Sequence, residues 1–333
     1  MKPKLVYIER KLQDFVSIER VFERVAAHLP EDQYECEFKK LEFGSGFTGI
    51  VKNLVHFEPP EADIYHITGH VHFIAKKLPF ERTVLTIHDL RILHTSSGLR
   101  RTFLKKFFLD WPLKYAKYIT TISEASKNDI VGLSGCDPDR IRVIENPVTI
   151  DSAEFGTHEL DTESPVVLQV GTEPHKNLER LIKAVEGIGC RLEIVGPLNG
   201  AQKELLENAD LEYASSEALN DEEMRSKYLE ADLLAFCSTF EGFGLPIVEA
   251  QAVGIPVVTS DREPMRGVSG GGAVLVDPEA PLSIRKGIRS VINDKELRTK
   301  IVEKGTLNVA RFEPSAVAAK YHEVYQEILS TSK

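Results

Sequence analysis

The chain has 333 residues, of which 42% are hydrophobic and 28% charged, and it is long enough for about two globular domains. Its formal net charge is −10, and the acidic excess lies after residue 150, because residues 1–150 carry 22 Lys and Arg against 20 Asp and Glu. An acidic half of this kind excludes nucleic-acid binding driven by charge.

The four cysteines are far apart and share no metal-ligand spacing: Cys36, Cys136, Cys190 and Cys237. This pattern favours reduced thiols in a cytoplasmic protein over a zinc site or a disulfide framework. The apolar run at the N-terminus is too short for a signal peptide, and no run approaches the about 20 apolar residues of a membrane span. We therefore expect a cytoplasmic protein.

The first half alternates apolar runs with helix-like stretches, the pattern of a parallel α/β sheet. Strands are predicted at residues 5–8, 63–67, 83–87, 118–122 and 141–144, and helices at residues 17–28, 100–116 and 123–133. A polar, acidic stretch without apolar period follows and predicts a linker. We expect an N-terminal domain at residues 1–150 and the linker at residues 151–164.

The alternation then restarts in the second half. Strands are predicted at residues 166–170, 191–195, 233–236, 255–259 and 273–276, and helices at residues 177–186, 221–230 and 245–253, with a mostly helical tail from 281 to 330. This pattern predicts a second α/β domain at residues 165–314. Two doubly wound domains facing a cleft would bind ligands at the carboxyl ends of their strands.

The segment from Ser238 to Ala250 places two glutamates, Glu241 and Glu249, between a predicted buried strand and a predicted helix. Gly242 and Gly244 allow backbone N–H groups to approach a ligand, and a helix start favours phosphate. One carboxylate on the loop and one on the helix could grip hydroxyls on either side of a diphosphate, as a nucleotide sugar requires. A solvated glutamate at each end of an ordinary strand–helix unit is the alternative.

This segment resembles the E-x7-E motif of the retaining glycosyltransferases of family 4, which have the GT-B fold of two Rossmann-like domains. The resemblance implies that Glu249 holds the donor ribose and that Glu241 holds hydroxyls of the sugar. Backbone N–H groups would hold the diphosphate and sugar together with Glu241, and these belong to Gly242, Phe243, Gly244 and Leu245. The family also implies that a C-terminal helix, residues 315–333, packs back on the N-terminal domain.

The activity implied by this resemblance is transfer of a hexosyl unit from a nucleotide diphosphate sugar to a hydroxyl, with retention of configuration. The acceptor would be a saccharide or a lipid-linked saccharide in polysaccharide or glycolipid assembly. The family needs no metal ion and no cofactor besides the nucleotide-sugar co-substrate. The sequence leaves the base, the sugar and the acceptor open.

A second motif ends a predicted strand at Gly171 and carries a cation, Lys176, on a short loop before a helix. A fixed ammonium there would stabilise the negative charge that develops on a leaving diphosphate. The segment is similar to the family's VGTxxPxKN sequence, whose lysine contacts the donor diphosphate. Thr172 and His175 stand where relatives commonly have an arginine, so Lys176 would hold the diphosphate with help from His175. An ordinary lysine at a helix start is the alternative.

His88 follows the predicted strand 83–87 in a segment similar to an HDL segment of the family, whose histidine lies near the transferred sugar. The resemblance implies that His88 acts at the donor sugar or the acceptor, and a structural histidine at a strand end is the alternative. Two further segments resemble family sequences and are interpreted as structural. Ser123 would cap a helix, and Asn146 would shape a turn.

Three histidines lie within seven residues: His66, His70 and His72. Their spacing without a nearby acid favours a surface on the acceptor side of the cleft over a metal site. The glycine-rich stretch 267–272 is interpreted as a flexible turn. The glycine-rich loop that many relatives carry after the first strand is absent, and residues 10–20 stand in its place.

Residues 100–117 contain six cations, one acid and several aromatic side chains. This composition fits a solvated helix with an apolar packing face, or a patch that contacts an anionic membrane at its inner face to reach a lipid-linked acceptor. Two rival functions also remain open. The chain could be a nucleotide-sugar epimerase of the GT-B fold, or a non-catalytic partner subunit that binds a nucleotide sugar.

Overall fold

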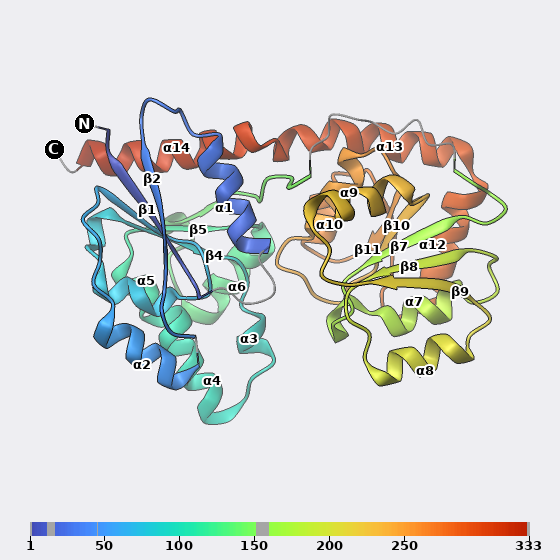
Figure 1. Ribbon diagram of the computed structural model, residues 1–333, viewed down its shortest axis with the longest axis horizontal. Coiled ribbons are helices and arrows are strands. Elements are labelled where there is room, and N and C mark those ends of the chain that lie inside the picture. The colour runs from blue at the N-terminus through green and yellow to red at the C-terminus, as the bar shows by residue number, and fades with distance from the viewer. Residues whose placement is uncertain (1, 12–16, 45, 151–159, 332–333) are drawn as a thin grey trace. The chain divides into compact units, whose positions relative to one another are not determined.

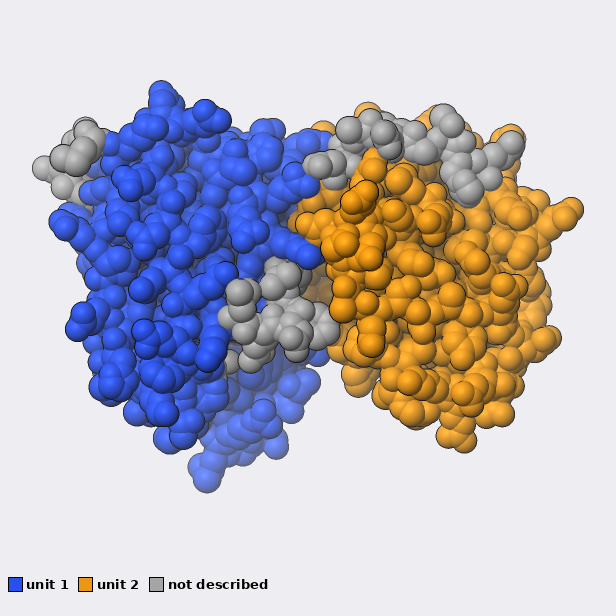
Figure 2. All heavy atoms as spheres, viewed as in Figure 1, with its two compact units in different colours: residues 1–147, 313–333 blue, residues 148–312 orange. Residues whose placement is uncertain are grey.

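The computed structural model describes residues 2–11, 17–44, 46–150 and 160–331. The chain forms two compact units, coloured separately in Figure 2. Unit 1 comprises Met1–Pro147 and Glu313–Lys333, and unit 2 comprises Val148–Phe312. These boundaries fall slightly before the predicted ones, and residues 151–159 of the predicted linker lie outside the described residues.

Unit 1 contains a parallel sheet of six strands in the order β2-β1-β3-β4-β5-β6. The strands are β1 Lys4–Glu9, β2 Glu35–Lys40, β3 Ile64–Ile67, β4 Thr83–Ile87, β5 Tyr118–Thr121 and β6 Ile141–Val143. The strand order reverses between β1 and β3, because the chain moves outward to β2 before it returns to the other side of β1. At such a reversal the loops diverge and leave room for a ligand.

Seven α-helices of unit 1 are described: α1 Ser17–Ala27, α2 Phe47–His56, α3 Arg91–His94, α4 Gly98–Lys105, α5 Pro112–Tyr115, α6 Glu124–Ser134 and α14 Pro314–Thr331. Among them, α6 and α14 contact strands of this sheet (Figure 1). Ser123 caps α6 by accepting a hydrogen bond from the Ser126 backbone N–H at 3.1 Å, as predicted.

The prediction of one helix over residues 100–116 is wrong in part. α4 ends at Lys105, a π-helical turn follows at Lys106–Asp110, and α5 starts at Pro112. Proline has no backbone N–H and cannot continue an α-helical ladder, and a wider π turn accommodates the interruption.

Unit 2 also contains a parallel sheet of six strands, in the order β12-β11-β10-β7-β8-β9. The strands are β7 Val166–Val170, β8 Arg191–Val195, β9 Glu212–Ser216, β10 Leu233–Phe236, β11 Val257–Ser260 and β12 Val274–Val276. Here the order reverses between β7 and β10. The prediction of two doubly wound, Rossmann-like units is therefore confirmed.

Seven α-helices of unit 2 are described: α7 Leu178–Val185, α8 Gly200–Asn208, α9 Asp221–Glu230, α10 Leu245–Ala252, α11 Met265–Ser269, α12 Pro281–Asn293 and α13 Lys295–Val309. The stretch 267–272 is only partly the predicted turn, because its first residues form the end of α11. Gly270 ends that helix with φ 57°, and a Cβ at Gly272 would lie 2.5 Å from the Gly305 backbone N. Close packing against α13, and not flexibility, explains Gly272.

The sequence analysis missed two strands, and both lie at sheet edges. β2 and β9 read Glu-Cys-Glu-Phe-Lys-Lys and Glu-Tyr-Ala-Ser-Ser, and most of their residues are exposed or half-buried. Edge strands carry charged and polar side chains because solvent covers one side of them. They therefore lack the apolar run that identified the central strands.

The last helix, α14, belongs to unit 1 and packs against α1 (Figure 1, red). Its Tyr325 hydroxyl is hydrogen-bonded to Nδ1 of His66 on β3 at 2.7 Å, and Nε2 of His66 is bonded to Thr86 Oγ1 at 2.7 Å. Tyr325 also donates to the Tyr7 hydroxyl at 3.4 Å. His66 is fully buried, so its predicted place on an acceptor surface is wrong: its side chain points from the strand into the helix interface.

We expect Tyr325→Phe to lower the free energy of unfolding of unit 1 by about 1–3 kcal/mol, because a buried imidazole nitrogen loses its partner. Urea unfolding followed by fluorescence reports on unit 1 alone, since the single tryptophan of the chain is Trp111. The control Glu327→Gln removes an exposed ion pair with Arg142 and should change stability by less than about 0.5 kcal/mol. Equal effects of both variants would contradict the role given to the buried network.

Candidate functional site

The loops that follow β7 and β10 meet at the strand reversal of unit 2, and they carry most of the predicted site residues. Lys176 lies at the end of the loop after β7, and Glu241 lies in the loop after β10. Their side chains form an ion pair, with Nζ and Oε1 separated by 2.8 Å, and both are largely buried. The ammonium also lies 4.7 Å from the centre of the Phe236 ring. The sequence predicted both residues but not that they pair.

Gly171 makes room for the lysine. Its φ of 91° lies in the left-handed region, and a Cβ at this position would lie 2.8 Å from Cγ and Cε of Lys176. Any larger residue would therefore displace the lysine side chain and strain the backbone. This is the physical reason for a glycine at the end of the strand.

Two amide side chains that the sequence analysis missed hold this loop in shape. Gln169 donates from Nε2 to the carbonyl oxygens of Gly171 and Lys176, at 2.9 and 3.2 Å. Asn177 has φ 65° and donates from Nδ2 to the carbonyls of Cys237 and Pro278, at 2.9 and 2.7 Å. Asparagine tolerates the left-handed region better than most residues, so the Lys-Asn pair at a loop–helix junction could have indicated this brace.

The backbone after Glu241 turns into α10 at Gly244, where φ is 111°. Pro246 stands in the first turn, where its missing N–H costs no hydrogen bond. The Phe243 side chain is buried and packs edge-to-face on Phe312 at 5.6 Å. Phe243 can therefore offer a ligand only its backbone, as can Gly242 and Gly244.

Glu249 lies on α10 and is 8% exposed. The buried Tyr228 hydroxyl donates to its Oε2 at 2.6 Å, and the Thr149 hydroxyl donates to its Oε1. The two glutamates of the motif thus have different partners: Glu241 contacts a cation, and Glu249 contacts hydroxyl groups.

Thr172, which stands at a position where relatives commonly have an arginine, holds the loop after β7 in place. Its Oγ1 donates to the Pro197 carbonyl at 2.6 Å, and its own carbonyl accepts from Gln202 Nε2 at 2.8 Å. His175 is half-buried, and its carbonyl accepts from the Thr239 backbone N–H at 2.8 Å. That bond joins the loop after β7 to the loop after β10.

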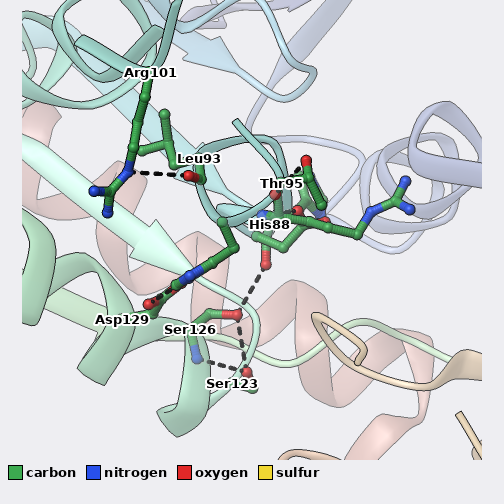
Figure 3. A network of polar contacts seen from close by, with 10 residues as sticks. His88, Leu93, Thr95, Arg101, Ser123, Ser126 and Asp129 are labelled. Carbon is green, nitrogen blue, oxygen red and sulfur yellow. Dashed lines mark hydrogen bonds and ion pairs between the residues drawn. The ribbon is translucent and has the colours of Figure 1, made fainter. Parts of the chain in front are cut away.

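His88 lies in unit 1 after β4 and is buried. Its Nε2 is 2.8 Å from the Thr68 carbonyl oxygen, which can only accept, so Nε2 carries the proton. Burial lowers the pKa of His88 to about 4, which keeps the ring neutral at pH 7. The His88 carbonyl accepts from the Ser126 hydroxyl at 3.0 Å, and Ser123 donates to Ser126 (Figure 3). The helix cap thus also fixes the histidine.

Glu9 at the end of β1 was missed by the sequence analysis. It is 1% exposed, and its Oε1 has no hydrogen-bond partner among the described residues. Burial, followed by the charge of Glu19, raises the pKa of Glu9 to about 7. Next to it, Arg10 Nε pairs with Glu19 Oε1 at 2.8 Å. A Cβ at Gly69, after β3, would lie 3.3 Å from the Arg10 backbone N, so the two loops at the strand reversal of unit 1 touch.

Two family models match the chain, "Glycosyl transferases group 1" over residues 151–307 and "Glycosyltransferase Family 4" over residues 18–152. The O-antigen chain mannosyltransferase RfbU of Salmonella typhimurium is 28% identical over 62% of this chain and 60% of its own length. The O-antigen chain mannosyltransferase B of Escherichia coli is 27% identical over 75% of this chain and 70% of its own length.

Solved structures show the same fold at low sequence identity. Anabaena Alr3699/HepE in complex with UDP and glucose has a TM-score of 0.74 and 18% identity, and the match covers 98% of this chain and all of that one. WaaG, a glycosyltransferase involved in lipopolysaccharide biosynthesis, has a TM-score of 0.70 and 15% identity, with 96% of this chain and 99% of that one covered.

We expect the stability of unit 1 to fall as the pH falls from about 6.5 to about 4. Burial lowers the pKa of His66 to about 3 and the pKa values of His72 and His88 to about 4. The unfolded chain therefore binds more protons than the folded chain in this pH window. The stability that the neutral buried histidines contribute is complete only above the pKa of an unfolded histidine, about 6.5. Burial also lowers the pKa of His70 to about 4. Glu9 acts in the opposite sense between pH 4.5 and 7, but it is one group against four.

Urea unfolding at several pH values, followed by Trp111 fluorescence, measures this slope. The variant His72→Leu should make the slope shallower, because it removes one group that binds a proton only on unfolding. A flat stability profile between pH 6.5 and 4, or an unchanged slope in the variant, would contradict the assignment of neutral buried histidines.

Proposed function

Because the chain belongs to the group 1 glycosyl transferases, the family 4 enzymes of the GT-B fold, we propose that it moves a hexosyl unit from a nucleotide diphosphate sugar to a hydroxyl of a saccharide or lipid-linked saccharide. Anomeric configuration is retained, as is usual in the family. The named relatives that build O-antigen chains support an acceptor in polysaccharide or glycolipid assembly.

The ion pair between Lys176 and Glu241 is the observation that carries the proposal. It lies at the strand reversal where doubly wound sheets bind ligands, beside the N-terminus of α10. When the donor binds, its diphosphate replaces Glu241 as the counterion of Lys176. Glu241 then accepts hydrogen bonds from the sugar hydroxyls. Lys176 then stabilises the charge that grows on the leaving diphosphate.

The other predicted donor-site residues bind the rest of the donor or position the two loops. Glu249 takes hydroxyls of the ribose, and the backbone N–H groups from Gly242 to Leu245 contact the diphosphate. Gly171 and Thr172 shape the loop that presents Lys176, and His175 joins this loop to the one that carries Glu241.

His88 acts on the sugar side as a neutral hydrogen-bond acceptor. Because Nε2 donates to the Thr68 carbonyl, Nδ1 is the ring atom with an acceptor lone pair. A hydroxyl of the sugar or of the acceptor can donate to it. The lowered pKa keeps this lone pair unprotonated over the physiological pH range.

We expect Lys176→Met to lower turnover by about 10²–10³-fold, the usual loss when one electrostatic contact to developing charge is removed. Glu241→Gln should also lose most turnover. The measurement is release of nucleoside diphosphate from UDP-sugars and GDP-sugars in the presence of a candidate acceptor. Lys183→Met, at an exposed lysine on the neighbouring α7, is the matched control and should keep the wild-type rate.

Wild-type turnover in both Lys176→Met and Glu241→Gln would overturn the proposal. Two further measurements, analysis of the donor after incubation without acceptor and nucleotide binding, separate the rival functions. Interconversion of the donor without any acceptor would identify an epimerase, whereas nucleotide binding without turnover would identify a non-catalytic partner subunit.

We also propose that unit 1 contacts an anionic membrane surface, which would give access to a lipid-linked acceptor from the cytoplasm. Phe47 and Val55 on α2 are each 65% exposed, and Leu99 on α4 is 90% exposed. The centres of the Phe47 and Phe103 rings lie 5.3 Å apart, so the start of α2 contacts α4. No described helix is both long and apolar enough to cross a bilayer.

Cations lie on α2 and on segments that precede and follow α4. Lys76 and Lys106 lie 5.0 and 4.8 Å from the centre of the Trp111 ring, and Lys52 lies over Phe43. Of these three cations only Lys106 belongs to the predicted patch at residues 100–117, and the exposed apolar residues Phe47, Val55 and Leu99 lie before that patch. Exposed apolar side chains and cations in the same unit fit the headgroup region of an anionic bilayer.

We expect the protein to float with vesicles that contain phosphatidylglycerol and to remain behind with pure phosphatidylcholine vesicles. Phe47→Ser with Leu99→Ser should reduce flotation severalfold, because apolar insertion is lost. Leu282→Ser with Leu307→Ser, at two exposed leucines of unit 2, is the matched control. Equal flotation of wild type and both double variants would refute contact through this surface.

A further inference from the structure

The carboxylate of Glu249 is held by hydroxyl groups of the chain itself. Tyr228 donates to Oε2 at 2.6 Å, and Thr149 donates to Oε1. In the proposed function Glu249 binds the ribose, which carries two neighbouring hydroxyls.

The two hydroxyls differ in how firmly they are placed. Tyr228 stands in the last turn of α9 and is fully buried, so its hydroxyl cannot leave the carboxylate without opening the core. Thr149 is half-buried and lies outside the helices and strands. Its neighbours Val148 and Ile150 are buried, and the Val148 N–H donates to the Phe312 carbonyl at 2.8 Å. A rotation about χ1 is enough to withdraw the Thr149 hydroxyl while the backbone stays in place.

The Thr149 hydroxyl is also chemically similar to the ribose hydroxyl that would replace it. It is an aliphatic secondary alcohol, as are the 2′- and 3′-hydroxyls of ribose, and it donates to a carboxylate that can only accept. Exchange of one alcohol for another keeps the number of hydrogen bonds constant. The buried charge of Glu249 is then never left without a donor, which would be costly.

We propose that Thr149 occupies the place of a ribose hydroxyl on Glu249 when no nucleotide is bound, and that Tyr228 is the positioning residue that orients this carboxylate in both states. The inference rests on the proposed function, because it assumes that Glu249 receives the ribose. Nucleotide binding rotates Thr149 away and leaves the bond from Tyr228 intact. Thr149 thus competes with the ligand, whereas Tyr228 assists it.

The variants Thr149→Val and Tyr228→Phe separate these two roles. Thr149→Val keeps the shape and removes the competing hydroxyl, so it should bind UDP or GDP about tenfold more tightly, the worth of one hydrogen bond to a charged group. Tyr228→Phe should bind the same nucleotide about tenfold more weakly, because the carboxylate loses its fixed orientation. Thr149→Ser keeps a hydroxyl and is the matched control with wild-type affinity.

The decisive readout is the affinity ratio between each nucleotide and its 2′,3′-dideoxy counterpart, measured by calorimetry on the full chain. We expect the affinity for the ribonucleotide, relative to its dideoxy counterpart, to rise in Thr149→Val and to fall in Tyr228→Phe. Binding of dideoxy-UDP and dideoxy-GDP should stay unchanged in both variants. A variant that is merely less stable shifts both affinities alike and leaves the ratio constant, so a structural role for Tyr228 would be recognised.

An unchanged ratio in Thr149→Val would overturn the role of Thr149, and an unchanged ratio in Tyr228→Phe would overturn that of Tyr228. Failure of the proposed function looks different: the wild-type chain would bind no nucleoside diphosphate of any base, and the inference would fall with it. Nucleotide binding with equal affinity for ribose and dideoxyribose would instead remove Glu249 from the ribose site.

Discussion

The site of unit 2 depends on one geometric constraint of parallel sheets. All strands end at the same edge, and the loops diverge where the strand order reverses. At the reversal between β7 and β10, Lys176 and Glu241 form an ion pair although they are 65 positions apart in the chain. Gly171 gives the lysine space, and Gln169 and Asn177 brace the loops, so the surrounding residues serve to hold this pair in place.

The two glutamates of the motif have different surroundings, which suit different parts of one ligand. Glu241 lies beside an ammonium group, and Glu249 lies beside two hydroxyls. A nucleotide sugar has a charged diphosphate between two hydroxylated rings, so this arrangement offers a cation for its centre and acceptors for its ends. Each carboxylate is satisfied before a ligand arrives, which limits the cost of burying its charge.

Unit 1 uses buried polar groups in another way. His66 links β3 to α14 through Tyr325, so the last helix of the chain completes the interior of the first unit. The buried histidines are kept neutral, because burial disfavours their charged form. Glu9 and the Arg10–Glu19 pair lie at the strand reversal of this unit, where the family's glycine-rich loop is absent.

The sequence by itself determined the two α/β units, the family and its enzyme class, because central strands and motif residues follow local patterns of apolar periodicity and spacing. It missed the edge strands β2 and β9, whose polar residues carry no such pattern, and it misjudged His66, whose partner Tyr325 is 259 positions away. The roles of Lys176, Glu241 and His88 in catalysis, and of Glu249 in donor binding, stay predictions. Only the tertiary structure decided which side chains meet, since the pairs Lys176–Glu241, Tyr228–Glu249 and Thr149–Glu249 join segments that no local pattern connects.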